Sequence, residues 1–206
     1  MLKTILSNKI IQEFLRISFG NILEWYDFTI YGLLAIQLAQ VFFPNNSKFT
    51  GLIMVFTTFA MGFLARPFGS LLFGRIGDKY GNHYAVTLSI WLMAISSGII
   101  CLLPSYQTIG IFAPLFLVLL RVCQGLSAGG QFSGLITIAI NTTTKNTSFL
   151  VSLVHAIAII GSLLASLIVY LDLNLFKNLL PSLAYIAWRI PFGISFILFI
   201  VYLWLN

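Results

Sequence analysis

The chain has 206 residues, of which 59% are hydrophobic and only 8% are charged, and its mean hydropathy is +1.00. Soluble domains carry roughly 25% charged residues, so this composition excludes an ordinary water-soluble domain and predicts a surface that faces lipid. The formal net charge is +6, but the Lys and Arg residues are scattered without a basic stripe, which argues against a nucleic-acid partner.

Six segments are long and apolar enough to cross a membrane, which takes about 20 residues of helix. In chain order they are Ile17–Phe43, Gly51–Phe73, Ala85–Leu103, Ile109–Ile140, Ser148–Leu171 and Trp188–Leu205. The stretches between them are polar or rich in turn-forming residues, and we expect loops at 44–47, 74–84, 103–105, 141–147 and 172–182. The sequence therefore predicts an all-α membrane protein, with an N-terminal segment at 1–16 and a bundle of six transmembrane helices at 17–206.

The basic residues outside the membrane predict the orientation of the bundle. With a cytoplasmic N-terminus, six of them lie inside and three lie outside or at the outer boundary. The inner group is Lys3, Lys9, Arg16, Arg75, Lys79 and Lys145, and the outer group is Lys48, Lys177 and Arg189. Positive charge concentrates on the cytoplasmic side of membrane proteins, so both termini are expected to be cytoplasmic.

Four charged residues, Glu24, Asp27, Arg66 and Arg121, fall within the predicted spans. A charge at the bilayer centre costs at least about 2.5–3.5 kcal/mol, so such residues face the interior of a bundle. Glu24 and Asp27 are three residues apart and share one helix face. Two interpretations stay open, a buried charge network that fixes helix packing, or a proton pathway in which the acids titrate.

Four glycines on the predicted fourth span form overlapping Gly-x-x-x-Gly spacings. They are Gly125, Gly129, Gly130 and Gly134. Small residues four apart let two helix backbones approach closely, so this pattern predicts a helix-packing face.

The sequence contains no Ser/His/Asp or Cys/His arrangement, no metal-ligand cluster and no nucleotide-binding loop. We therefore expect neither an enzyme, a metal site nor a bound cofactor.

After the second span, residues 74–81 read Gly-Arg-Ile-Gly-Asp-Lys-Tyr-Gly. This stretch resembles the signature loop of the major facilitator superfamily. The resemblance implies a cytoplasmic gate made by Gly74, Arg75, Gly77, Asp78, Lys79 and Gly81.

Further stretches resemble the metabolite:proton symporter family within that superfamily. They are the first-span sequence at 20–28, the fourth-span sequence at 121–130, and the shorter motifs at 65–69 and 188–192. That family includes permeases for proline and betaine, α-ketoglutarate, citrate and shikimate, and the proline/betaine type is our first choice. The resemblance implies the N-terminal six-helix half of a twelve-helix fold, in which each half is a 3+3 inverted repeat.

Three departures from the family pattern concern coupling and gating. Asn82 and His83 stand where the signature loop usually has two basic residues, and Gln131 stands where the fourth-helix signature continues with Glu. A Gln cannot titrate, so that carboxylate has no equivalent here.

The resulting hypothesis is half of a proton-coupled symporter for a small polar metabolite, an osmolyte or an organic acid, in a bacterial inner membrane. Glu24, Asp27 and Arg121 would couple protons, with Arg66 as their charge partner, and Gln124 and Gln131 would line the substrate site. The proton gradient would supply the energy, and the partners would be the bilayer and either a second six-helix half or a copy of the chain. The alternative is a truncated or split transporter product that acts as a non-transporting subunit or an inactive fragment.

Overall fold

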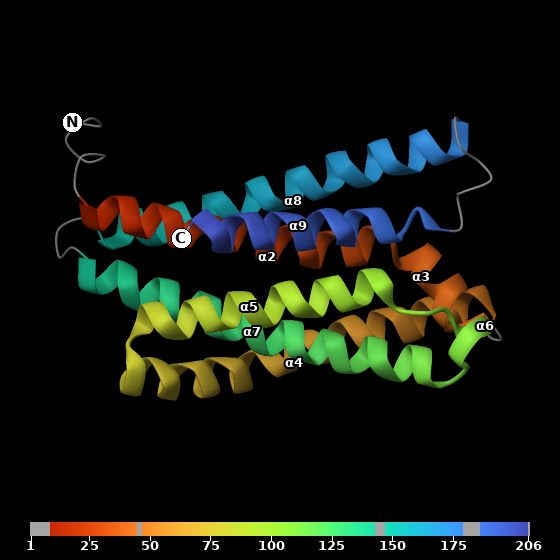
Figure 1. Ribbon diagram of the computed structural model, residues 1–206, viewed down its shortest axis with the longest axis horizontal. Coiled ribbons are helices and arrows are strands. Elements are labelled where there is room, and N and C mark those ends of the chain that lie inside the picture. The colour runs from red at the N-terminus through yellow and green to blue at the C-terminus, as the bar shows by residue number, and fades with distance from the viewer. Residues whose placement is uncertain (1–8, 45–46, 143–146, 179–185, 206) are drawn as a thin grey trace.

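The computed structural model describes residues 9–44, 47–142, 147–178 and 186–205, and all regular structure in these ranges is helical. The helices are α2 (Lys9–Leu33), α3 (Ala35–Phe42), α4 (Lys48–Tyr80), α5 (Asn82–Leu102), α6 (Tyr106–Ile109), α7 (Phe112–Thr142), α8 (Thr147–Asn178) and α9 (Arg189–Leu205). The long helices lie along one common axis and alternate in direction, while α3 and α6 lie together at one end of the bundle (Figure 1).

Each of the six predicted spans coincides with a helix or a pair of helices. Within the described residues, four helices are long and apolar enough to cross a membrane, namely α4, α5, and the parts of α7 and α8 at Phe112–Thr137 and Ser152–Asn174. Helix α9 is apolar but has 17 residues, and α2 carries Glu24 and Asp27. Residues 1–8 of the predicted segment 1–16 lie outside the described residues, and α2 already begins at Lys9.

The first predicted span is divided at Leu34, where α2 ends and α3 begins. The backbone N–H of Leu34 still donates to the Ile30 carbonyl, and that of Leu38 donates to the Leu34 carbonyl, both at 2.9 Å. The helical hydrogen bonding therefore continues through this point, and α3 reaches the end of the bundle.

The predicted loop at 74–84 is wrong, because α4 continues to Tyr80 and α5 begins at Asn82. Only Gly81 departs from helical geometry, with a φ of 97° that a residue without a side chain adopts easily. Gly77 stays inside the helix and packs against Asn82, where a Cβ would lie 2.7 Å from the Asn82 side-chain oxygen. The signature residues are thus the last two turns of a helix.

The predicted break at 44–47 is confirmed, since α3 ends at Phe42 and α4 begins at Lys48, but two other predicted loops are shorter than expected. Helix α8 continues through Asn178, so Asp172 is helical, and α7 continues through Thr142. Residues 143–146 and 179–185 of these two predicted loops lie outside the described residues. The turn at 103–105 is confirmed, and Gly110, with a φ of 59°, separates α6 from α7.

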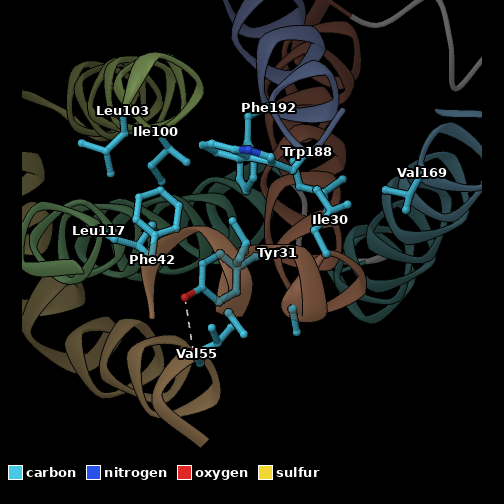
Figure 2. Packing of buried hydrophobic residues seen from close by; sticks show 14 of the residues in the cluster. Ile30, Tyr31, Phe42, Val55, Ile100, Leu103, Leu117, Val169, Trp188 and Phe192 are labelled. Carbon is cyan, nitrogen blue, oxygen red and sulfur yellow. Dashed lines mark hydrogen bonds between the residues drawn. The ribbon is translucent and has the colours of Figure 1, made fainter. Parts of the chain in front are cut away.

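Two apolar clusters hold the helices together. One includes Tyr31, Phe42, Leu117 and Trp188, and Figure 2 shows Tyr31 reaching from α2 towards Val55 on α4, where its hydroxyl donates to the Val55 carbonyl at 3.3 Å. The second cluster is built around Leu23, Phe28, Val86, Ile90 and Phe199. Phe59 packs against both clusters, so the apolar core is nearly continuous along the bundle.

Candidate functional site

Two acidic residues one turn apart on α2 are fully buried. Glu24 is 1% exposed and Asp27 is 0% exposed. A buried carboxylate must be paired or hydrogen-bonded, because its desolvation is otherwise prohibitive. The two acids meet this requirement in different ways.

Asp27 is bound by side chains from three other helices. Its Oδ1 accepts hydrogen bonds from Ser97 on α5 at 2.7 Å and from Ser195 on α9 at 2.9 Å. Its Oδ2 accepts from the amide of Gln124 on α7 and lies 3.7 Å from Nη1 of Arg121. Both carboxylate oxygens are therefore occupied by partners within the chain.

Arg121 contacts three aromatic rings beside Asp27. Its guanidinium carbon is 3.8 Å from the centre of the Tyr31 ring, 5.1 Å from that of Phe28 and 5.3 Å from that of Phe59. Nη1 donates to the Gln124 side-chain oxygen, while Nε and Nη2 have no partner among the described residues. Cation–π contact and the Asp27 charge together offset the burial of this cation.

Glu24 has one partner, Arg66 on α4. Oε1 of Glu24 lies 3.3 Å from Nη2 of Arg66, and Oε2 is buried without a hydrogen-bond partner in the described part of the chain. The guanidinium carbon of Arg66 lies 4.3 Å from the centre of the Phe28 ring and 4.4 Å from that of Phe63. The Arg66 side chain is 22% exposed, so the chain does not fully enclose this pair.

The two predicted substrate-lining glutamines differ in position. Gln124 belongs to the Asp27 cluster, where its amide nitrogen also donates to Ser97 at 2.9 Å. Gln131 lies two turns further along α7, donates to Ser127 at 3.0 Å and keeps its buried oxygen without a partner among the described residues. Both glutamines are buried, at 0% and 1% exposure.

The predicted packing glycines lie where α7 crosses its neighbours. A Cβ on Gly125 would fall on the Gly62 carbonyl of α4, and one on Gly129 would fall on the Arg66 carbonyl. Gly130 faces the Phe73 ring of α4, and Gly134 faces Val86 of α5. This close crossing sets the distance between the helix that carries Arg66 and the helix that carries Arg121.

The predicted gate residues lie at the end of α4, beside the turn at Gly81. Arg75, Asp78 and Lys79 are exposed. They take part in neither of the two ion pairs found among the described residues, Glu24–Arg66 and Asp27–Arg121. The structure therefore separates them from the buried charges.

Sequence reasoning missed several residues that complete the site. Ser97 and Ser195 bind Asp27, and the rings of Phe28, Tyr31 and Phe63 hold the two arginines. Isolated serines and phenylalanines are common in apolar helices, so they give no signal. Gly62 and Gly69 could have been recognised, because their spacing of seven residues places them on one face of α4. In the structure each faces an α7 carbonyl.

The chain matches the family model "Sugar (and other) transporter" over residues 14–205. It is 39% identical over 190 residues to the alpha-ketoglutarate permease of Escherichia coli (strain K12), covering 92% of this chain and 44% of the permease. It is also 39% identical over 192 residues to the proline/betaine transporter of Salmonella typhimurium, covering 92% of this chain and 38% of the transporter. The chain thus spans less than half the length of these curated relatives.

Among solved structures, the proton:xylose symporter XylE superposes with a TM-score of 0.81 at 19% identity, over 95% of this chain and 44% of XylE. A partially occluded, inward-open form of XylE from E. coli gives a TM-score of 0.80 over 97% of this chain. These matches confirm the predicted fold class, the N-terminal half of the major facilitator fold. The chain therefore belongs to the sugar (and other) transporter family of the major facilitator superfamily.

Proposed function

We propose that the chain forms one half of a proton-coupled symporter for a small polar metabolite in a bacterial inner membrane. The observation that carries this proposal is the pair of buried acid–base contacts between α2, α4 and α7, Glu24–Arg66 and Asp27–Arg121. Ionisable groups inside a membrane bundle are expensive and typically mark proton or substrate pathways.

The names of the relatives support a substrate that carries a carboxylate. They include an alpha-ketoglutarate permease, proline/betaine transporters, a shikimate transporter and a citrate-proton symporter. All of these solutes bear a carboxylate group. We accordingly assign the substrate to the class of small organic acids and zwitterions.

Within the charge network, Glu24 is the acid that exchanges the proton in our proposal. Its Oε2 is free to accept one, whereas both oxygens of Asp27 already accept hydrogen bonds. Protonation of Glu24 cancels its charge and leaves Arg66 with an uncompensated positive charge. That charge would attract the carboxylate of a substrate, so one proton and one carboxylate load together.

The remaining groups receive supporting roles. Arg121 pairs with Asp27, Gln124 and Gln131 supply polar contacts, and the exposed end of α4 locks against the second half of the transporter. The partner is a second six-helix half or a copy of this chain. This partner would pack on the apolar faces of α4 and α8, since these are the least buried of the four long apolar helices.

The direct test is uptake by proteoliposomes under an imposed inward proton gradient. The chain is co-expressed with the C-terminal half of the E. coli alpha-ketoglutarate permease, and proline, glycine betaine, 2-oxoglutarate, citrate and shikimate are tested. We expect gradient-driven uptake of at least one solute, and its loss with Glu24→Gln. Asp172→Asn is the matched control, because Asp172 is a buried acid outside the charge network. Gradient-driven uptake that survives Glu24→Gln would disprove the role of Glu24.

Infrared spectroscopy of the chain alone gives a second test that needs no partner. The chain has only two glutamates, Glu13 and Glu24, and three aspartates. Selective ¹³C labelling of the glutamate carboxyls therefore distinguishes Glu24 from Asp27. As the pH is lowered, we expect a protonated-carboxyl band to appear that shifts with labelled glutamate and is missing in Glu24→Gln, and a band that shifts only with labelled aspartate would contradict the assignment.

A further inference from the structure

A cavity of about 560 Å³ lies where α3, α6 and the start of α9 meet, away from the buried charges. Its polar lining comes from Gln40 on α3, from Ser105, Gln107 and Thr108 at α6, and from Arg189 on α9, with Trp188 beside it. Ser195, which binds Asp27, lies six residues beyond Arg189, about 9 Å along the α9 axis at 1.5 Å per residue. The cavity therefore lies more than one helix turn from Asp27, towards the end of the bundle that holds α3 and α6 (Figure 1).

Arg189 brings a positive charge to this cavity and forms no ion pair with a carboxylate among the described residues. Of the five acids, Glu24 and Asp27 pair with Arg66 and Arg121, and neither ion pair among the described residues includes Arg189. Asp172 lies on α8 and is in neither ion pair. Glu13 and Asp78 belong to the opposite end of the bundle, near the start of α2 and the end of α4.

The guanidinium of Arg189 is held in place but only partly satisfied. One of its NH₂ groups donates to the Leu103 carbonyl at 3.0 Å, and its carbon lies 5.0 Å from the centre of the Trp188 ring. Its Nε is buried and lacks a hydrogen-bond partner in the described part of the chain. Because Nε is out of contact with solvent, an anion in the cavity would have to bind at the other N–H groups of the guanidinium.

We propose that this cavity is a binding site for the carboxylate group of a small solute. An arginine fork matches the two oxygens of a carboxylate, and the surrounding amide and hydroxyl groups can donate to the rest of the solute. The volume lies in the range of small-molecule sites, roughly 300–1,000 Å³. The site goes beyond the proposed function, because binding here requires neither a second half nor a proton gradient.

The proposal also gives a role to residues 188 and 189, which the charge network does not use. Under the predicted orientation the cavity opens on the outer side of the membrane. A solute would then meet Arg189 before it reaches Arg66.

The test is calorimetric titration of the purified chain in detergent with succinate, with the isosteric and uncharged succinamide as the matched probe. We expect succinate to bind, and Arg189→Gln to weaken binding about tenfold or more, as expected for loss of a charged hydrogen-bonding group. Lys48→Gln is the matched control, because Lys48 is an exposed cation at the same end of the bundle. It should leave the affinity unchanged.

A second pair of variants keeps the proposal testable even if Arg189→Gln fails to fold. Gln107 is exposed at the rim on α6. Its replacement by Glu should weaken succinate binding about fivefold, and its replacement by Lys should strengthen it by a similar factor. Equal affinity for both variants would overturn the proposal.

Three further outcomes would also overturn it. Binding of succinamide as strong as that of succinate would exclude recognition of a carboxylate. Inorganic phosphate or anionic lipid that displaces succinate at lower concentration would identify a site for phosphate headgroups. Binding that is lost with Arg66→Gln but kept with Arg189→Gln would place succinate at the central charges, which would leave the proposed function intact.

Discussion

The acids of the two ion pairs found among the described residues lie one turn apart on α2, yet the pairs differ in almost every other respect. Asp27 is enclosed by α5, α7 and α9, and both of its oxygens accept hydrogen bonds. Glu24 contacts a single cation on α4 and keeps one oxygen without a partner among the described residues. The same chemical pairing is therefore saturated with hydrogen-bond partners in one place and only partly satisfied in the other.

The cations differ in the same direction as the acids. The Arg121 side chain is 0% exposed, whereas that of Arg66 is 22% exposed and lies against Phe63, itself 38% exposed. A partly exposed cation is less tightly enclosed than a fully buried one, so removing its partner should cost less. The difference teaches that helix crossings around each acid, rather than the acids themselves, decide which pair is rigid.

The largest expected effect is the loss of the Asp27 carboxylate. In Asp27→Asn, Arg121 keeps its charge in a fully buried site, and an amide group now faces the hydroxyl donors of Ser97 and Ser195. Breaking one partner of a buried pair costs about 3–5 kcal/mol, so we expect a loss of that size in the free energy of unfolding. Denaturant unfolding in micelles, followed by circular dichroism, measures it.

The matched control for this variant is Asp78→Asn, at the exposed end of α4. A surface change of this kind should alter the free energy of unfolding by less than about 0.5 kcal/mol. A loss for Asp27→Asn as small as that of the control would show that Asp27 is not a structural anchor.

The next effect in size is the loss of the Glu24 charge. In Glu24→Gln, Arg66 keeps its contacts with Phe28 and Phe63 and its side chain stays partly exposed. We therefore expect a loss of about 2 kcal/mol, below the range for a fully buried pair. The same unfolding measurement applies, and a loss that equals or exceeds that of Asp27→Asn would reverse the comparison between the two pairs.

The sequence predicted the helices and the faces that matter, but not the pairing of the charges. Hydropathy located the six passes, and the three-residue spacing placed Glu24 and Asp27 on one face. Both α4 and α7 offer an arginine, and which acid each one meets depends on how the helices cross. That crossing is fixed by contacts such as Gly125 against the Gly62 carbonyl, which belong to two helices at once.

Two errors have a common physical cause. The stretch 74–84 was expected to be a loop because it is polar and contains Gly74 and Gly77, but the helix continues through both, and the start of α5 packs closely on Gly77. The roles of Ser97 and Ser195 gave no signal, because a serine in an apolar helix commonly bonds a carbonyl of its own helix, as Ser96 does. Tertiary contacts decided both cases.

The third effect concerns a single donor to Asp27. Ser195→Ala removes one of the two hydroxyls that bind Oδ1 and leaves the Arg121 contact in place. A hydrogen bond to a charged group contributes about 1.5–3 kcal/mol, and we expect the lower end because Ser97 remains. Ser166→Ala is the control, since this exposed hydroxyl bonds only its own helix, and an equal change in both variants would argue against a network around Asp27.

The smallest expected effect tests the aromatic side of the Glu24 pair. Arg66→Lys keeps the positive charge near Glu24 but loses the planar contact with the rings of Phe28 and Phe63. A cation–π contact at a partly exposed site contributes about 0.5–1 kcal/mol, so the free energy of unfolding should fall by about that amount, while Arg75→Lys on the exposed end of α4 should have no effect. Because the lysine still neutralises Glu24, gradient-driven uptake in the co-expressed pair should persist at a reduced rate. A complete loss of uptake would mean that the fork of Arg66, rather than its charge, is what the exchangeable pair requires.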